Sequence, residues 1–290
     1  MKISFLGLGT MGWPMAANLL AAGYDLRAWN RSPEPGQRLA ARGAQVASSP
    51  REAVRDADVV ILILADDAAT RSTLQAADEA LRPGAIVVNM ATVSAELSAG
   101  LAADFAGRGI RYVAAPVLGR VDVAEAGELN ILAAGEAAAI DTVQPLFDVM
   151  GRKTWRYGER PEQASVVKLA VNFMIASAIG AMGEAVALVR GHGVDAADFL
   201  GLVTSTGFAS PVYQGYGSAI ADERFTPAGF RLALGLKDVN LAIAAAEQAR
   251  VPLTLASTVR DAIIEGLAHG DGDLDFAALA RTSARRAGQA

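Results

Sequence analysis

The chain has 290 residues, with 26 basic and 31 acidic side chains and a formal net charge of −5 at pH 7. A chain of this length buries roughly three quarters of the surface that its unfolded form exposes, which favours a large core split between two domains. The acidic balance argues against nucleic acid and anionic membranes as partners. The chain has no cysteine and two histidines, which excludes disulfides, thiolate nucleophiles and sites built from Cys or several His, so we predict no metal.

Lysine is rare in this sequence. Four of the 26 basic residues are lysines, and the others are arginines. Arginine stays protonated at working pH, whereas lysine can give up its proton, so each lysine is a candidate for proton chemistry. The four are Lys2, Lys153, Lys168 and Lys237.

Two apolar stretches bear on a membrane interpretation. The longest uncharged run near the middle, residues 169–183, is shorter than the roughly 20 apolar residues that span a bilayer. At the N-terminus, Lys2 and the apolar residues after it are similar to a secretory signal, but the glycines and Pro14 that follow favour a strand, a turn and a helix. We therefore expect a soluble cytoplasmic protein that does not bind a membrane.

Strand and helix patterns alternate in the first half of the chain. Ser49 and Glu52 form a capping-box pattern at the start of one helix. This alternation is typical of βαβ units in a parallel sheet, so the predicted fold class is an α/β Rossmann-type doubly wound sheet. The predicted strands are 3–6, 26–29, a short one at 46, 59–64, 86–88 and 112–114, and the predicted helices are 15–20, 33–42, one opening at 49–52, 69–80 and 95–107.

The second half changes character. A strand at 130–133, a helix at 137–150 and a strand at 154–157 come first, and from about residue 161 every pattern is helical. We predict a dinucleotide-binding domain over residues 1–161 and an all-α C-terminal domain for substrate and oligomerisation over 162–290. The second domain begins with a long interdomain helix. Its predicted helices cover 162–190, 229–248 and 252–269.

The motif Gly7-x-Gly9-x-x-Gly12 follows the first strand and opens the first helix. The first glycine permits a tight turn, the second lets the backbone approach a pyrophosphate, and the third allows close packing of helix on strand. The helix N-terminus then offers N–H groups and the positive end of its dipole to the phosphates. This placement between strand and helix predicts a dinucleotide site.

The end of the second strand indicates which dinucleotide binds. An NAD enzyme usually has Asp or Glu there, to accept hydrogen bonds from the ribose 2′-hydroxyl. This chain has Asn30, Arg31 and Ser32 instead. Asn30 does not repel a 2′-phosphate, and Arg31 and Ser32 can hydrogen-bond to one. NADPH/NADP is therefore the predicted cofactor in preference to NADH, although a surface arginine at a helix start is the alternative for Arg31.

The same N-terminal stretch carries a longer pattern. It reads Gly7-Leu8-Gly9-Thr10-Met11-Gly12-Trp13-Pro14-Met15-Ala16-Ala17-Asn18-Leu19. This resembles the opening of the β-hydroxyacid dehydrogenase family, which includes 3-hydroxyisobutyrate dehydrogenases and glyoxylate/succinic semialdehyde reductases and is related to 6-phosphogluconate dehydrogenase. The resemblance implies an NAD(P)-dependent dehydrogenase or reductase with a small carbonyl or hydroxy-acid substrate. It also implies cofactor contacts from Leu8, Thr10, Met11 and Leu64.

Four further segments resemble family motifs, so that the resemblance covers essentially the whole chain. Residues 89–94 resemble the segment beside the nicotinamide, with a clear match only at Thr92. Residues 115–120 resemble the D-A-P-V-S-G-G substrate loop, and 168–172 the K-x-x-x-N element. Residues 237–242 resemble the C-terminal K-D-x-x-L-A motif, which implies that Lys237 approaches the cofactor.

Lys168 and Asn172 also make chemical sense together. Four residues apart in the long helix, they lie on one face, and we expect that face to point into the cleft between the domains. Carbonyl reduction needs a proton for the oxygen, which a lysine ammonium can bind and then protonate as the general acid. In the oxidative direction, neutral lysine is the base. The family resemblance implies that Asn172 orients the substrate.

The substrate loop departs from the family pattern at two positions. Leu118 replaces the serine, which removes a donor and adds apolar volume, and Arg120 replaces the second glycine, while Gly119 is kept. Our hypothesis is that Arg120 clamps a substrate carboxylate or that the loop favours a bulkier, less polar carbonyl compound. Arg120 pointing to solvent is the alternative.

Three functions are compatible with the sequence. The first is an NADPH-dependent reductase of small aldehydes or oxo acids, and the second is an imine reductase. Leu118 mildly favours the second, but Lys168 argues against it, since those related enzymes usually lack this lysine. The third is a non-catalytic nucleotide-binding module, which needs no proton donor. The Ala- and Gly-rich stretch 175–187 allows close helix approach, consistent with a homodimer or homotetramer. We assign Asp66 and Asp67 to helix capping.

Overall fold

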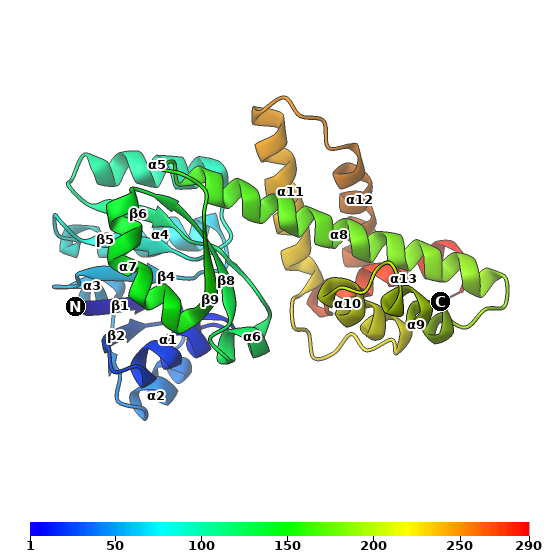
Figure 1. Cartoon of the computed structure of the whole chain (residues 1–290), viewed down its shortest axis with the longest axis horizontal. Coiled ribbons are helices and arrows are strands. Elements are labelled where there is room, and N and C mark those ends of the chain that lie inside the picture. Colours follow the sequence, from blue (N-terminus) through cyan, green and yellow to red (C-terminus); the bar gives the residue numbers. More distant parts are fainter. Residues whose placement is uncertain (290) are drawn as a thin grey trace. The chain divides into compact units, whose positions relative to one another are not determined.

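The computed structural model describes residues 1–289. The chain divides into two compact units, Met1–Lys168 and Leu169–Ala290. Helix α8 (Glu162–Gly191) begins in the first unit and continues into the second (Figure 1).

The first unit is built on a parallel sheet. Its strand order is β3-β2-β1-β4-β5-β6-β8-β7, with β9 paired to β8. The pairs from β3 to β6 are parallel, β8 runs antiparallel to β6 and β7, and β9 is parallel to β8. This 3-2-1-4-5-6 order is that of a dinucleotide-binding Rossmann fold and confirms the predicted fold class. The strands are β1 (Lys2–Leu6), β2 (Asp25–Trp29), β3 (Gln45–Val46), β4 (Val59–Leu62), β5 (Ile86–Asn89), β6 (Arg111–Ala114), β7 (Val117–Leu118), β8 (Leu129–Gly135) and β9 (Gly151–Arg156).

Apolar side chains cover both faces of this sheet. Successive strand residues point to opposite faces, so Ile61 joins the core under α1 and α7 while Val60 and Leu62 join the core under α4 and α5. The first turns of α8 pack on the same core as α4 and α5, where Ala164 is fully buried. The helices of this unit are α1 (Gly12–Ala21), α2 (Pro33–Ala40), α3 (Pro50–Val54), α4 (Asp67–Ala77), η1 (Asp78–Ala80), α5 (Ala95–Ala106), α6 (Val121–Glu125) and α7 (Ala137–Met150).

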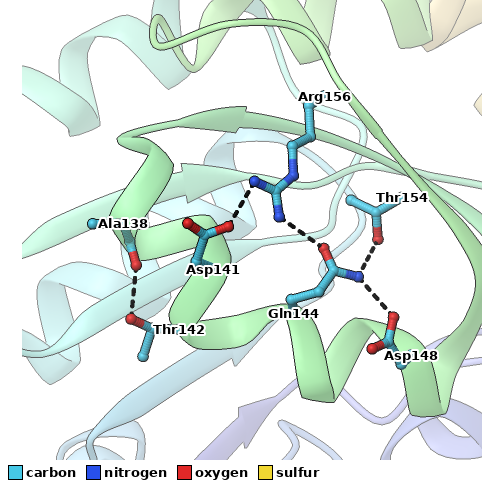
Figure 2. A network of polar contacts seen from close by, with 7 residues as sticks. All are labelled: Ala138, Asp141, Thr142, Gln144, Asp148, Thr154 and Arg156. Atoms are coloured by element: carbon cyan, nitrogen blue, oxygen red, sulfur yellow. Dashed lines mark hydrogen bonds and ion pairs between the residues drawn. The ribbon is translucent and has the colours of Figure 1, made fainter.

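A polar network fixes β9 against α7 (Figure 2). Gln144 of α7 donates to Thr154 Oγ1 at 2.9 Å and to Asp148 Oδ1 at 2.7 Å. Arg156 donates to Gln144 Oε1 at 3.2 Å and to Asp141 Oδ1 at 2.7 Å. These polar contacts hold β9 in place, although most of its side chains are exposed.

The second unit is all-helical and has its own apolar core. Within it, α11 packs on α12, α9 on α10 and α12 on α13. The buried Asp271 pairs with Arg281 at 2.6 Å and Arg285 at 2.7 Å, which anchors the C-terminal helix. Besides α8, the helices are α9 (Ala196–Ser205), α10 (Pro211–Ala221), α11 (Leu232–Gln248), α12 (Thr254–Ala268), η2 (Asp271–Asp273), η3 (Phe276–Ala278) and α13 (Leu279–Arg286).

The structure differs from the predicted elements in several places. The fourth strand ends at Leu62, two residues before the predicted end, and the helix predicted from residue 229 begins at Leu232. Several elements were not predicted individually. β7 has two residues and α6 has five, which is too short to show a periodic pattern, and α9, α10 and α13 fall in the region that was predicted only as generally helical. Ser49 caps α3 as predicted, but the Glu52 carboxylate accepts from Ser48 N–H at 2.7 Å.

Among residues 1–289, α8 is the one helix that is long and apolar enough to cross a membrane by length and composition. The core helix of a soluble protein passes the same test, so this helix decides nothing about a membrane.

Candidate functional site

The sheet reverses its winding between β1 and β4. The helix after β1 packs on one face, and the helix after β4 packs on the other. In such sheets the ligand binds in the crevice at the carboxyl ends of the two strands. The glycine-rich loop follows β1, and Leu64 follows β4, so both lie at this crevice.

The three glycines of the loop meet different constraints. Gly7 has φ +100°, and a Cβ there would lie 2.3 Å from Ile63 O and 2.8 Å from Leu64 Cδ2. A Cβ on Gly12 would lie 2.0 Å from Gly7 O. A Cβ on Gly9, in contrast, would project into open space. The backbone is thus tightly packed at Gly7 and Gly12 and accessible at Gly9. This arrangement fits a pyrophosphate at the N-terminus of α1.

The end of β2 is joined to this loop. Asn30 Oδ1 accepts from Leu8 N–H at 2.9 Å, and Asn30 Nδ2 donates to Ser32 O at 2.9 Å. Gly7 N–H donates to Trp29 O at 2.9 Å. Asn30 therefore organises the loop, a role that the sequence pattern did not indicate. Arg31 and Ser32 are exposed beside it.

The next loop along this edge, residues 90–94, carries Thr92 and is held at both ends. Asn89 Oδ1 accepts from Ala91 N–H at 3.0 Å, and Ser94 caps α5 by accepting from Leu97 N–H at 2.9 Å. Asp67 accepts from Ser94 N–H at 2.9 Å and from its hydroxyl.

Asp66 and Asp67 follow β4, and both were predicted to cap a helix. Asp66 caps α4 by accepting from Ala69 N–H at 2.8 Å, as predicted. Asp67 instead links the start of α4 to the start of α5 through Ser94. Sequence reasoning missed this link because it joins residues 27 positions apart.

The predicted substrate loop follows β6. Gly119 has φ +149°, and a Cβ there would lie 2.6 Å from Leu129 Cδ2 and 2.9 Å from Val123 Cγ1. Leu118 packs against the apolar core, while Arg120 is exposed at the N-cap position of α6. The turn therefore requires glycine at 119 and leaves Arg120 at the surface.

Asn18 ties this loop to the helix of the glycine motif. Its Nδ2 donates to Ala124 O at 2.9 Å, across 106 positions of sequence. The residue stands in the family pattern, yet nothing local indicated which segment it would hold. This hydrogen bond attaches α6, the helix that follows Gly119 and Arg120, to α1.

In the second unit, a buried carboxylate organises two predicted site residues. Asp238 accepts a hydrogen bond from Asn172 Nδ2, and its Oδ1 lies 3.0 Å from Lys237 Nζ. The Asp238 side chain is 4 % exposed. Because a carboxylate only accepts, the amide nitrogen of Asn172 faces Asp238 and its Oδ1 faces away. Sequence reasoning named Asn172 and Lys237 but missed Asp238, although it follows Lys237 directly.

Taken by unit, the structure gathers the predicted residues into two groups. The first group lies along one edge of the sheet, after neighbouring strands. It consists of the glycine loop, segment 30–32, Leu64, Thr92 and segment 118–120. Asn172 and Lys237 meet through Asp238. Lys168 is the last residue of the first unit and lies on α8, one turn before Asn172. Within residues 1–289, no group of three or more His, Asp or Glu could hold a metal ion.

Two family models together match almost the whole chain. Residues 2–158 match the NAD binding domain of 6-phosphogluconate dehydrogenase. Residues 163–283 match the NAD-binding domain of NADP-dependent 3-hydroxyisobutyrate dehydrogenase.

Full-length relatives show the same likeness. The chain is 41% identical to uncharacterized oxidoreductase YfjR of Bacillus subtilis, over 96% of this chain and 98% of the relative. It is 33% identical to glyoxylate/succinic semialdehyde reductase 1 of Arabidopsis thaliana, over 96% and 97%.

Solved structures agree with these relatives. The 3-hydroxyisobutyrate dehydrogenase of Mycobacterium tuberculosis, solved with L-serine, superposes with a TM-score of 0.88 at 29% identity, over 97% of this chain and 98% of that one. An imine reductase from Pseudomonas sp. superposes less closely, with a TM-score of 0.65 at 25% identity over 97% and 98%.

Proposed function

Because the chain belongs to the β-hydroxyacid dehydrogenase family of NAD(P)-dependent oxidoreductases, we propose that it interconverts a small aldehyde or oxo acid and its hydroxy acid with NADPH. Glyoxylate and succinic semialdehyde are the substrate type, as in the name of the Arabidopsis relative. One observation carries the proposal: Asp238 holds Asn172 with its Oδ1 turned away, one helical turn after Lys168.

When bound, NADPH would supply the hydride for the carbonyl carbon. The open backbone at Gly9 and the N-terminus of α1 would hold its pyrophosphate. The Lys168 ammonium binds the carbonyl oxygen, stabilises the negative charge that develops there, and then transfers a proton to it. In the oxidative direction, neutral Lys168 takes the hydroxyl proton.

Asn172 orients the substrate for this transfer. Its Oδ1 is an acceptor for the hydroxyl of the hydroxy acid, because Asp238 holds the amide nitrogen on the opposite side. Lys237, paired with the same carboxylate, lies 23 % exposed and is the proposed contact to the cofactor.

The experiment that tests the function is an NADPH-oxidation screen of the purified protein across oxo acids, semialdehydes and cyclic imines. Turnover of the first two classes supports the proposal. Turnover of imines alone would favour the second candidate, an imine reductase, which Leu118 and the structural likeness to imine reductases support.

Arg120→Ala tests the proposed carboxylate clamp. If Arg120 binds the substrate carboxylate, this variant should raise the KM for oxo acids and leave the KM for uncharged aldehydes unchanged. An unchanged KM for every acid contradicts the clamp.

Lys168→Ala tests the proton donor. We expect turnover to fall by roughly 10²–10⁴-fold, the usual range for a lost general acid, while NADPH affinity stays close to that of the wild type. Single-turnover kinetics and a fluorescence titration of NADPH separate the two effects. Lys153→Ala, on the exposed strand β9, is the matched control and keeps full turnover. Near-normal turnover of Lys168→Ala would show that the proton comes from another group.

Arg31→Ala tests the preference for NADPH. A charge-assisted hydrogen bond to phosphate contributes about 1.5–3 kcal/mol, so the KM for NADPH rises by roughly ten- to a hundredfold while that for NADH changes little. Arg152→Ala removes the same charge from an exposed site on β9 and serves as the control. A wild-type enzyme that prefers NADH contradicts this assignment before any variant is made.

A further inference from the structure

A buried pair of serines joins α5 to the first turns of α8. Ser98 is 0% exposed and Ser165 is 3% exposed, and their hydroxyl oxygens lie 2.7 Å apart. Around them the core is apolar, with Phe105 and the fully buried Ala164 among its members. A buried hydroxyl without a partner costs about 1–3 kcal/mol, so in this core each serine depends on polar neighbours.

The pair is part of a longer series of hydrogen-bonded side chains that runs from α8 through α5 and β6 to β5. Ser98 also hydrogen-bonds to the phenol of Tyr112, which in turn accepts from Asn89 Nδ2 at 3.0 Å. Burial raises the pKa of Tyr112 to about 12, so the phenol keeps its proton at every working pH. The phenol therefore stays a neutral hydrogen-bonding group near neutral pH, between Ser98 and Asn89.

Both ends of this series reach proposed site segments. Asn89 fixes the loop that carries Thr92, through the hydrogen bond from Ala91 N–H. Ser165 lies three residues before Lys168 in α8, so the two side chains lie on neighbouring positions of one helix face. All of these residues belong to the first unit.

We propose that Ser98 and Ser165 are positioning residues that set Lys168 relative to the loop of Thr92. The pair fixes the rotation of the first turns of α8, and with it the direction in which the Lys168 ammonium points. A misplacement of the proton donor by a fraction of an ångström lowers the rate without changing cofactor affinity. The inference rests on the proposed role of Lys168 as the proton donor.

The first test replaces Ser165 with Ala. The expected result is a kcat lower by roughly five- to tenfold, which corresponds to about 1–1.4 kcal/mol of activation free energy, with an unchanged KM for NADPH. Ser4→Ala is the control for loss of a buried hydroxyl in the same unit: Ser4 lies on β1, outside this hydrogen-bonded series, and its Oγ has no hydrogen-bond partner among residues 1–289. Ser98→Ala/Ser165→Ala removes both hydroxyls, so that neither serine is left without its partner and Tyr112 keeps the hydrogen bond from Asn89, and we expect the same loss of kcat.

A double-mutant cycle with Lys168→Ala shows whether the serine acts through the lysine. Ser165→Ala should have no further effect on turnover in the Lys168→Ala background, because the group that it positions is gone. A fully additive loss would overturn the inference, as would a Ser165→Ala enzyme that behaves like Ser4→Ala. If Lys168→Ala itself retains turnover, the proposed mechanism fails first, so the two failures are distinguishable.

Discussion

Glycines in the dinucleotide loop serve two separate purposes. Gly12 is required by packing, because a Cβ would overlap Gly7 O and lie 2.8 Å from Ile63 Cγ2. Gly9 faces open space and is required only if a ligand approaches the backbone there. The same sequence motif thus combines one position that packing requires with one that is open to a ligand.

Two alanine variants separate these roles. Gly12→Ala should lower the melting temperature, because the backbone around Gly7 must move to admit a methyl group. Gly9→Ala should melt like the wild type in the absence of ligand and bind NADPH more weakly. Differential scanning calorimetry and a fluorescence titration measure the two quantities. Unchanged NADPH affinity in Gly9→Ala would show that the pyrophosphate does not approach this position.

Single polar side chains also hold the loops of the site in place. Asn30 joins the glycine loop to the end of β2, Asn18 holds α6, and Asp238 orients Asn172. Each forms a hydrogen bond with a backbone or amide group of another segment. At this scale the site is positioned by side chains that need not touch the substrate.

Among the elements, three of the helices that follow strands begin with side-chain caps. Ser49, Asp66 and Ser94 each accept a hydrogen bond from a backbone N–H in the first turn of α3, α4 and α5. These helices begin at the carboxyl edge of the sheet, where the candidate site lies. A cap therefore sets where each helix starts and also how the loop before it enters the site.

Removing one cap should cost a predictable amount of stability. Asp66→Ala leaves the Ala69 N–H without its partner, and we expect the free energy of unfolding to fall by about 1 kcal/mol. Ser32→Ala is the control: Ser32 holds the N-cap position of α2, where the structure of residues 1–289 shows no side-chain cap. Urea unfolding with an unchanged m-value measures the difference. Equal losses in both variants would contradict the assigned cap.

For the whole molecule, the two units have separate cores that are linked by α8. All three tryptophans, Trp13, Trp29 and Trp155, belong to the first unit. Tryptophan fluorescence therefore reports on the dinucleotide-binding unit, whereas far-ultraviolet circular dichroism reports on the helices of both.

This separation predicts the effect of cofactor on unfolding. A ligand that binds only the folded state stabilises it by about 2.7 kcal/mol at a hundred times its Kd. We expect NADP⁺ to raise the midpoint of the fluorescence transition more than that of the circular dichroism transition in the same urea titration. Coincident transitions that shift equally would instead show that the two units unfold as one.

Two predictions about the whole molecule stay predictions. These are a homodimer or homotetramer and a cytoplasmic location. For the first, Met174 and Leu188 of α8 are 67% and 64% exposed, in agreement with an apolar helix face that another chain could cover.

Features that depend on neighbours along the chain were predictable from the amino-acid sequence. The alternating strands and helices, the glycine loop and the change to helices near residue 161 were readable because period and turn chemistry are local properties. The family motifs extended this to the class of reaction, and they predict Lys168, Asn172 and Lys237 as site residues. Short elements such as β7 and α6 escaped, because two or five residues carry no period.

The contacts between residues that lie far apart in the sequence could not be predicted and depend on how the elements pack. Ser98 and Ser165 are 67 positions apart, and Asn172 and Asp238 are 66 apart. Their pairing depends on how strands and helices pack, and a serine or aspartate in one segment says nothing about its partner in another. The physical reason is that a buried polar group must find a hydrogen-bond partner somewhere, while the fold alone decides where.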